Sequence, residues 1–359
     1  MNGLSDGTGM FDDELFLSDL RTCADHIVGL SGLNKITVLV TGATGMLGAF
    51  LVDVLMQANT DLGLGITVVA CARNEEKFEK RFAHLTDDAR SHLQFQEYDM
   101  LKELPESFND IHADFVIHAA GNAYPSAFVN HPEETVRGNI EGTEKLLEYS
   151  ERAGVTRFLY ISSGEVYSIP EKTDFNESVL EKVRADGART CYPYSKLAAE
   201  KLCLAGNRDT ETVVARLCHT FGPGASPYDD RAHAQFARRA AAGEDIVLNS
   251  AGTQLRSYNY IVDAVSGILS VLLKGEAGQC IDICSPENVI TIRGLADLMA
   301  KVAGVKVIVR EPDANEKRLS SPITRQVLRE DALCSLGWKK AFDLESGTRH
   351  YLGFLKNGF

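Results

Sequence analysis

The sequence feature that constrains the fold most is an apolar run that leads straight into spaced glycines. Residues 35–42, KITVLVTG, are typical of a buried β-strand, and Gly42, Gly45 and Gly48 follow at intervals of three, before an amphipathic segment at 49–59. A tight turn needs glycine, a pyrophosphate approaches only bare backbone, and the start of a helix offers free N–H groups to an anion. The junction therefore predicts a dinucleotide-binding site; an ordinary glycine-rich turn is the alternative, which this context disfavours.

Short apolar runs and amphipathic segments then alternate along the chain. The further runs that read as strands are ITVVACA, HLQFQEYD, DFVIHAA, RFLYISS and ETVVARL. Segments with helical spacing of apolar residues, such as 134–154 and 194–206, lie between several of them. Strands that are apolar throughout are buried on both faces, so the pattern predicts an α/β fold with a Rossmann-like doubly wound parallel sheet.

The texture of the sequence divides the chain further. We expect a dinucleotide-binding domain at 35–220, to which 257–283 returns, and a smaller mixed α/β substrate-binding lobe formed by 221–256 and 284–359. Residues 1–34 read as an N-terminal helical appendage that packs against the main body or against a second subunit.

Composition excludes several classes of function. The formal net charge of -13 argues against a nucleic-acid partner, although a few converging arginines can still bind a small anion. No apolar run is long enough to span a bilayer, and the acidic N-terminus is not a signal peptide. The eight cysteines show no metal-binding pattern and read as thiols, so we expect a cytoplasmic protein without a membrane partner or metal.

Tyr192 and Lys196 are the expected catalytic pair. They lie four residues apart in CYPYSKLAAEKL, which places both side chains on one face of a helix. An ammonium beside a phenol favours the phenolate and lowers a tyrosine pKa that is normally about 10. We expect Tyr192 to act as general base on a hydroxyl whose carbon gives up hydride, and Ser163 of ISSGEVY to bind the same hydroxyl. A surface pair on an ordinary helix is the alternative, which the upstream glycines disfavour.

Together these motifs resemble the extended short-chain dehydrogenases/reductases, the NAD-dependent epimerase/dehydratase family that acts on nucleotide sugars. The resemblance covers residues 36–340. It includes HAA at 118–120, NIEGT, RTCYPYSK, RLCHTFGP, DDR at 229–231 and the late LGW, and in motifs it is closest to the UDP-glucuronate decarboxylases. It implies an NAD(P)-dependent enzyme, a nucleotide-diphosphate sugar substrate, and a homodimer formed through helices around 133–152 and 191–206.

The resemblance also implies the residues that hold the cofactor. They are Gly42, Thr44, Gly45, Met46, Leu47, Gly48, Arg73, Asp99, Met100, Ala119, Ala120, Asn139, Tyr192 and Lys196. NAD is the expected cofactor. NADP stays open because no acidic residue follows the second strand, where an NAD enzyme binds its ribose, and Arg73 stands nearby instead. Arg73 can equally stack on the adenine or remain solvated.

Members of the family are expected to oxidise carbon 4 of the sugar first, and the residues after Ser163 then decide the outcome. The 4,6-dehydratases carry an Asp–Glu pair there, whereas this chain has Gly164 and Glu165. Glycine cannot donate a proton, so the pair favours a UDP-glucuronate decarboxylase-like reaction, with Glu165 catalytic. A 4-epimerase, a 4,6-dehydratase and a 4-keto reductase remain alternatives. A structural role for Glu165 and a non-catalytic NAD(P)-sensing protein are the further alternatives.

Basic residues at family-matched positions are the expected ligands of the substrate. A guanidinium group can donate two parallel hydrogen bonds to the oxygens of one phosphate or carboxylate, which suits a nucleotide diphosphate or a sugar carboxylate. The expected substrate residues are Arg189, His219, Arg231, Arg256 and Arg325. His219 stands where the decarboxylases usually have asparagine, so it is either a substrate ligand or a hydrogen-bonded loop histidine.

Overall fold

A seven-stranded parallel sheet forms the first lobe of this computed structural model, which describes residues 11, 13–169, 179–205, 208–285, 287–314 and 323–357. Its order is β10-β6-β5-β4-β1-β2-β3. The strands are β1 (Thr37–Thr41), β2 (Thr67–Ala72), β3 (Leu93–Glu97), β4 (Phe115–His118), β5 (Arg157–Ser163), β6 (Glu211–Leu217) and β10 (Cys280–Ile283). Every neighbouring pair is parallel, so the predicted Rossmann-like sheet is confirmed.

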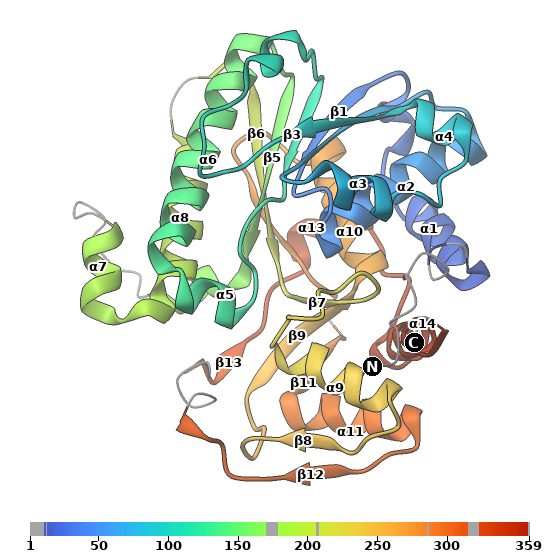
Figure 1. Ribbon diagram of the computed structural model, residues 1–359, viewed down its shortest axis with the longest axis vertical. Helices are drawn as coiled ribbons and strands as arrows, with labels where there is room; N and C mark the ends of the chain where they lie inside the picture. Colours follow the sequence, from blue (N-terminus) through green and yellow to red (C-terminus); the bar gives the residue numbers. More distant parts are fainter. Residues whose placement is uncertain are drawn as a thin grey trace.

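Helices cover both faces of this sheet (Figure 1). On one side lie α2 (Met46–Leu62) and α10 (Ile261–Lys274), and on the other lie α6 (Pro132–Ala153) and α8 (Cys191–Leu204). The side chains of β1 alternate accordingly, because successive residues of a strand point to opposite faces. Val38 and Val40 pack with the residues of α2, and Leu39 packs with those of α6 and α8. This explains why the strand is apolar throughout.

Shorter elements connect the strands and helices of the first lobe. They are α3 (Glu75–Arg81), α4 (Asp87–Ser91), α5 (Pro125–Asn130), α7 (Val179–Asp186), α13 (Asp331–Ser335) and the 3-10 turns η2 (Leu30–Leu33), η3 (Glu106–Asp110), η4 (Gly164–Ser168) and η5 (Ala188–Thr190). No helix in the described ranges is both long and apolar enough to cross a membrane.

The second lobe is a small mixed assembly. A four-stranded sheet has the order β11-β9-β13 with β7 paired to β9, and β8 pairs with β12. Its strands are β7 (His219–Phe221), β8 (Ile246–Leu248), β9 (Leu255–Tyr260), β11 (Val289–Thr291), β12 (Val307–Val309) and β13 (Arg325–Gln326), and its helices are α9 (Ala232–Ala241), α11 (Ile292–Ala303) and α14 (Leu344–Asn357). Within the predicted return at 257–283, α10 and β10 join the first lobe, while 257–260 belong to β9 of the second.

The described part of the N-terminal segment packs into the molecule rather than standing apart. Asp13 caps α1 (Glu14–Asp25), and Phe16 and Cys23 of this helix are fully buried. Buried Asp19 accepts hydrogen bonds from Tyr260 at the end of β9 and from His350 of α14. The helix therefore contacts both lobes, since it also packs on α2 and α10.

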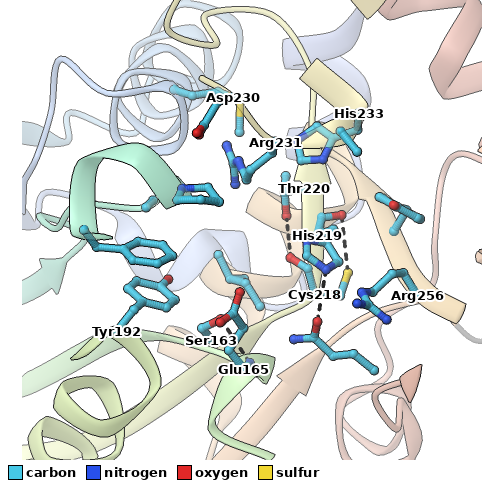
Figure 2. Close-up of a pocket in the computed structure, with 18 of the residues that line it drawn as sticks. Ser163, Glu165, Tyr192, Cys218, His219, Thr220, Asp230, Arg231, His233 and Arg256 are labelled. Carbon is cyan, nitrogen blue, oxygen red and sulfur yellow. Dashed lines mark hydrogen bonds between the residues drawn. The ribbon is translucent and has the colours of Figure 1, made fainter. Parts of the chain in front are cut away.

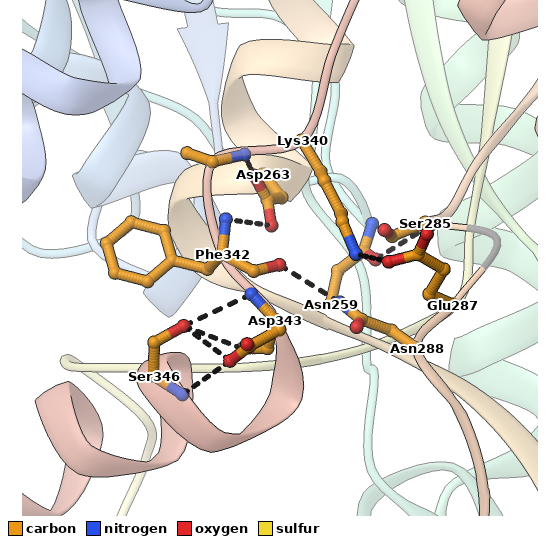
Figure 3. A network of polar contacts seen from close by, with 10 residues as sticks. Asn259, Asp263, Ser285, Glu287, Asn288, Lys340, Phe342, Asp343 and Ser346 are labelled. Carbon is orange, nitrogen blue, oxygen red and sulfur yellow. Dashed lines mark hydrogen bonds and ion pairs between the residues drawn. The ribbon is translucent and has the colours of Figure 1, made fainter.

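A polar network fastens the segment before α14 to the first lobe (Figure 3). Asp263 in the first turn of α10 accepts hydrogen bonds from the backbone N–H groups of Ala341 (2.6 Å) and Phe342 (3.2 Å). Asn288 donates to the carbonyl of Phe342 at 3.3 Å. Burial raises the pKa of Asp263 to about 6, so the two backbone donors only partly offset its desolvation. The network therefore connects the segment at 341–342 both to the first turn of α10 and to the loop before β11.

Candidate active site

A cavity of about 540 Å³ lies between the two lobes, at the carboxyl ends of the parallel strands. Its lining includes Gly42 and Tyr192 from the first lobe and Arg231 and Arg256 from the second (Figure 2). Ligands of open α/β sheets bind at this edge, where the strand order reverses, and here it reverses between β1 and β4. The four predicted catalytic residues, Ser163, Glu165, Tyr192 and Lys196, all line this one cavity.

The glycine junction packs too closely to accept side chains. A methyl group at Gly48 would lie 2.3 Å from the carbonyl oxygen of Gly42, and one at Gly42 would lie 2.9 Å from the Cα of Ala120. Gly42 also has a φ of 67°, which disfavours other residues. Gly45 begins α2 without a side chain to cap it, so the N–H groups of the first turn stay available to an anion.

Thr41, at the end of β1, fixes the neighbouring strand end. Its hydroxyl accepts hydrogen bonds at 3.1 Å from the backbone N–H groups of both Ala119 and Ala120. It also contacts Nδ1 of His118 at 2.8 Å. Burial lowers the pKa of His118 to about 3, so this histidine is neutral and structural. Sequence reasoning identified the two alanines but missed the threonine that holds them.

Lys196 lies buried beneath the cavity. Its Nζ donates to the carbonyl of Ile161 at 2.9 Å and lies 4.7 Å from the centre of the Tyr160 ring. Burial lowers the pKa of Lys196 to about 8, and the negative charge of Glu200, one helical turn further on, opposes that shift. The ammonium is thus present at neutral pH and is held in one place by the end of β5.

The environment of Tyr192 corrects one expectation. Burial and then the charge of Glu165 raise the pKa of Tyr192 to about 12, while the Ser163 hydroxyl, Arg231 and Arg189 lower it. The protein groups around Tyr192 therefore favour the neutral phenol. The prediction that they lower the pKa of Tyr192 is wrong. Burial at the cavity floor outweighs the favourable charges.

Glu165 and Arg189 form an ion pair in the cavity wall. Arg189 Nη2 donates to both carboxylate oxygens of Glu165, at 3.1 and 3.3 Å. The Nε and Nη1 atoms of Arg189 are buried and have no hydrogen-bond acceptor among the described residues. The two side chains are 13% and 18% exposed, so the pair still faces the cavity rather than the solvent. Arg189 thus has donors left for a ligand.

The structure explains why glycine stands between Ser163 and Glu165. A methyl group at Gly164 would lie 2.5 Å from Cδ1 of Leu328, which packs with Cys218 and Cys284 under the second lobe. An aspartate at this position would have to displace that buried leucine. The packing of Leu328 therefore disfavours a second acid beside Glu165.

Three of the predicted substrate residues come from the second lobe and point into the cavity. His219 Nε2 contacts Gln326 Oε1 at 3.0 Å, and burial keeps its pKa well below the ordinary value, so the ring is neutral. Arg231 is paired with Asp229. Arg256 donates to the carbonyls of Leu255 and Ile323 and lines the cavity as a buried cation.

Other predicted residues lie elsewhere. Arg325 is exposed, because the alternation of β13 turns its neighbour Gln326 inward, and Arg325 is absent from the described lining. Arg73 is exposed directly after β2, the neighbour of β1, and Asp99 and Met100 follow β3, the next strand outward. All three lie outside the cavity lining. Among the predicted cofactor residues, the cavity lining includes Met46, Leu47 and Ala119. It does not include Thr44, Ala120 or Asn139 among the described residues.

The cavity also contains polar residues that sequence reasoning missed. Asp230, Asn249 and Gln254 line its second-lobe side, and each keeps one buried oxygen without a donor among the described residues. Only Asp230 carried a signal, since it stands beside Arg231 in the DDR motif. All eight cysteines are unpaired, and no group of three or more potential metal ligands exists within the described ranges.

Comparison with known proteins identifies relatives over most of the chain. Residues 38–284 match the model of the NAD dependent epimerase/dehydratase family. The UDP-glucuronic acid decarboxylase 1 of Danio rerio is 29% identical over 322 residues, covering 89% of this chain and 72% of that protein. The UDP-glucuronic acid decarboxylase 6 of Arabidopsis thaliana is 28% identical over 320 residues, covering 88% of this chain and 87% of that protein.

Solved structures share the fold. The UDP-glucuronic acid 4-epimerase of Bacillus cereus, in complex with UDP-glucuronic acid and NAD, aligns with a TM-score of 0.72 and 21% identity, covering 90% of this chain and 100% of that one. The dTDP-glucose 4,6-dehydratase of Bacillus anthracis, in complex with NAD, aligns with a TM-score of 0.70 and 17% identity, covering 90% and 97%.

Proposed function

This chain belongs to the NAD dependent epimerase/dehydratase family, and we propose that it decarboxylates UDP-glucuronate through a 4-keto intermediate. The observation that carries the proposal is Glu165 beside Ser163, paired with Arg189 in a cavity where a side chain at Gly164 would press on Leu328. The UDP-glucuronic acid decarboxylases among its relatives support it, because they cover most of the chain.

NAD fits the first lobe. The glycines leave bare backbone for a pyrophosphate, and the uncapped start of α2 faces it. Asn139 keeps a buried Oδ1 without a donor among the described residues, close to Gly121 of the cavity lining. Arg73, Asp99 and Met100 continue along the strand edge, where the adenosine half would lie. Exposed Arg73 keeps NADP as the second candidate, and the affinities for the two cofactors decide between them.

The catalytic residues divide the proton transfers between them. Held at the glycine junction, NAD would supply reversible hydride transfer with carbon 4 of the sugar. Tyr192 takes the proton of the carbon 4 hydroxyl, and Ser163 binds the same oxygen. Because burial raises the pKa of Tyr192, this role requires that Arg231, Arg189 and the ammonium of Lys196, which is fixed on the carbonyl of Ile161, together favour the deprotonated form when the substrate is bound.

Glu165 serves the step that defines the reaction. Once carbon 4 is a ketone, the bond from carbon 5 to the carboxylate breaks, carbon dioxide leaves, and the electron pair moves to the ketone oxygen held by Tyr192 and Ser163. Carbon 5 then takes up a proton, and we assign its delivery to Glu165, whose carboxylate takes that proton from solvent water and passes it on. Tyr192 gives its proton back to the carbon 4 oxygen when the ketone is reduced again. The Nε and Nη1 donors of Arg189, which have no acceptor among the described residues, and the buried Arg256 guanidinium bind the anionic groups of the substrate.

The test is to incubate the purified protein with UDP-glucuronate and NAD and to measure carbon dioxide, UDP-pentose and NADH. We expect product without net NADH. Glu165→Gln should lower turnover by about 10²- to 10⁴-fold, because a positioned proton donor is lost. Glu133→Gln, at an exposed site on α6, is the control. Full turnover by Glu165→Gln, or no product from an enzyme that binds NAD, would contradict the proposal. A nucleotide-sugar panel would then test epimerisation and NADPH-dependent reduction.

We also propose that the protein is a cytoplasmic homodimer joined through α6 and α8. These helices pack side by side, and Leu204 at the end of α8 is 38% exposed. Leu197 and Leu202 of α8 are partly exposed and add some apolar surface to the same helix pair. Light scattering on the purified protein should give twice the chain mass, and a Leu204→Glu variant should shift it towards the monomer.

A further inference from the structure

Asp230 bridges the two lobes across the cavity. It precedes α9 in the second lobe, and its Oδ2 accepts a hydrogen bond at 3.0 Å from the backbone N–H of Ser126 in α5 of the first lobe. That N–H lies in the first turn of α5, where it has no partner within the helix. Figure 2 shows Asp230 on the cavity wall above Arg231.

The second carboxylate oxygen of Asp230 has no donor. Oδ1 is buried, and no described residue donates a hydrogen bond to it. Arg231, the next residue, is paired with Asp229 through its Nε and Nη2 atoms and so does not serve Asp230. Burial accordingly raises the pKa of Asp230. Asp230 lines the cavity, and a desolvated acceptor at its wall is suited to a donor on a ligand that reaches it, because leaving it unpaired is costly.

The surroundings of Ser126 place this acceptor at the catalytic end of the cavity. Phe128, two residues further along α5, stacks on the ring of Tyr192 with centroids 4.9 Å apart and planes at 14°. The guanidinium of Arg189 lies 5.0 Å from the centre of the same Phe128 ring. Asp230 is therefore fastened to the helix that packs against the catalytic tyrosine, so the sugar is the part of the substrate nearest to it.

We propose that Asp230 determines specificity by accepting, through Oδ1, a hydrogen bond from a hydroxyl group of the substrate's sugar. The inference rests on the proposed function, because it assumes that a nucleotide sugar occupies the cavity. A carboxylate forms a strong bond with a hydroxyl donor and penalises a sugar that lacks one, since its buried charge would then stay unpaired. The contact to Ser126 holds the carboxylate in place for this role.

The first experiment measures binding by calorimetry with NAD at saturation, and the proteins used for it carry Tyr192→Phe so that UDP-glucuronate is not consumed during the titration. Asp230→Ala should weaken UDP-glucuronate about tenfold or more and UDP alone less than twofold, because the lost acceptor serves the sugar. Glu244→Gln removes an exposed charge from the same lobe and should change neither affinity. A melting curve recorded by far-ultraviolet circular dichroism checks that each variant is folded. If Asp230→Ala is unfolded, Asp230→Asn replaces it.

The second experiment identifies the hydroxyl through UDP-sugars that each lack one hydroxyl group. The wild-type protein should bind one of them about tenfold more weakly than the parent sugar, and Asp230→Ala should show no such difference. Equal weakening of UDP and UDP-glucuronate by Asp230→Ala, or the same deoxy-sugar penalty in both proteins, would overturn the inference. A wild-type protein that binds UDP but none of the UDP-sugars would instead overturn the proposed function and the inference with it.

Discussion

The two sides of the cavity differ in how their polar groups are satisfied. On the catalytic wall, defined as Ser163, Tyr192 and Lys196 with the strand ends around them, the protein supplies the contacts: Lys196 donates to Ile161, and the Glu165 N–H donates to Ser163. On the substrate wall, defined as Asp230, Asn249, Gln254 and Arg256, three side chains keep a buried oxygen without a described donor.

The difference shows which interactions the fold prepares in advance. Groups that move protons must stay in one geometry through the reaction, and fixed partners on regular elements provide this. Groups that recognise a substrate gain from being unsatisfied until it binds, since their hydrogen bonds then contribute to affinity and selectivity. Changes to the catalytic wall should therefore act on turnover, and changes to the substrate wall should act on affinity.

The largest expected effect tests the catalytic wall. Tyr192→Phe should lower kcat by about 10²- to 10⁴-fold and change the Kd of UDP-glucuronate less than threefold, because it removes only the proton-transferring hydroxyl. Tyr194→Phe is the matched control, because the Tyr194 hydroxyl donates a hydrogen bond to Asp186 of α7 and Tyr194 is not part of the cavity lining. A large loss of affinity in Tyr192→Phe would show that the two walls are not separable. Steady-state kinetics and calorimetry provide the measurements.

A pH profile sharpens the assignment of Lys196. Its pKa of about 8 means that the ammonium is present below this pH and is lost as pH rises through it. We expect kcat/KM to fall above pH 8, approaching tenfold per unit. Lys196→Arg keeps its charge to a much higher pH, so its weaker activity should lack this descending limb. An identical limb in both proteins would assign the ionisation to another group.

Packing behind Glu165 should produce a moderate effect on stability. Gly164→Ala places a methyl group 2.5 Å from Leu328 and should destabilise the protein by about 1–3 kcal/mol, through overpacking. Urea unfolding measures the change. Gly164→Ala should destabilise the Leu328→Ala variant less than it destabilises the wild type, because the obstructing leucine side chain has been removed. Additive losses would show that the two side chains do not meet.

The smallest expected effect separates two arginines of the second lobe. Arg325→Gln should change the Kd of UDP-glucuronate less than twofold, because this side chain is exposed outside the cavity. Arg256→Gln should weaken binding at least tenfold, because a buried cation in the lining is lost. Equal effects would return Arg325 to the substrate wall. Calorimetry with UDP-glucuronate decides.

Local patterns in the sequence predicted most of the first lobe and of its catalytic wall. The strand-to-helix junction at Gly42–Gly48 and the four-residue spacing of Tyr192 and Lys196 each lie within one or two elements, so their geometry follows from the backbone alone. The strand segments are apolar throughout, and this pattern predicted that the sheet is buried on both faces. The order of the seven strands depends on long-range pairing, which no local pattern records.

Tertiary structure alone decided the substrate wall and the electrostatics. Arg325 was predicted to bind the substrate, but its neighbour Gln326 faces the cavity instead. Side chains alternate along β13, and the pairing of β13 with β9 fixes which of the two points inward. Tyr192 has a raised pKa because burial outweighs nearby charges, and burial is a property of the assembled fold. The sequence determined which chemical groups the protein carries; folding brought Asp230 to α5 and Leu328 to Gly164, because contacts between distant segments arise only when the lobes pack together.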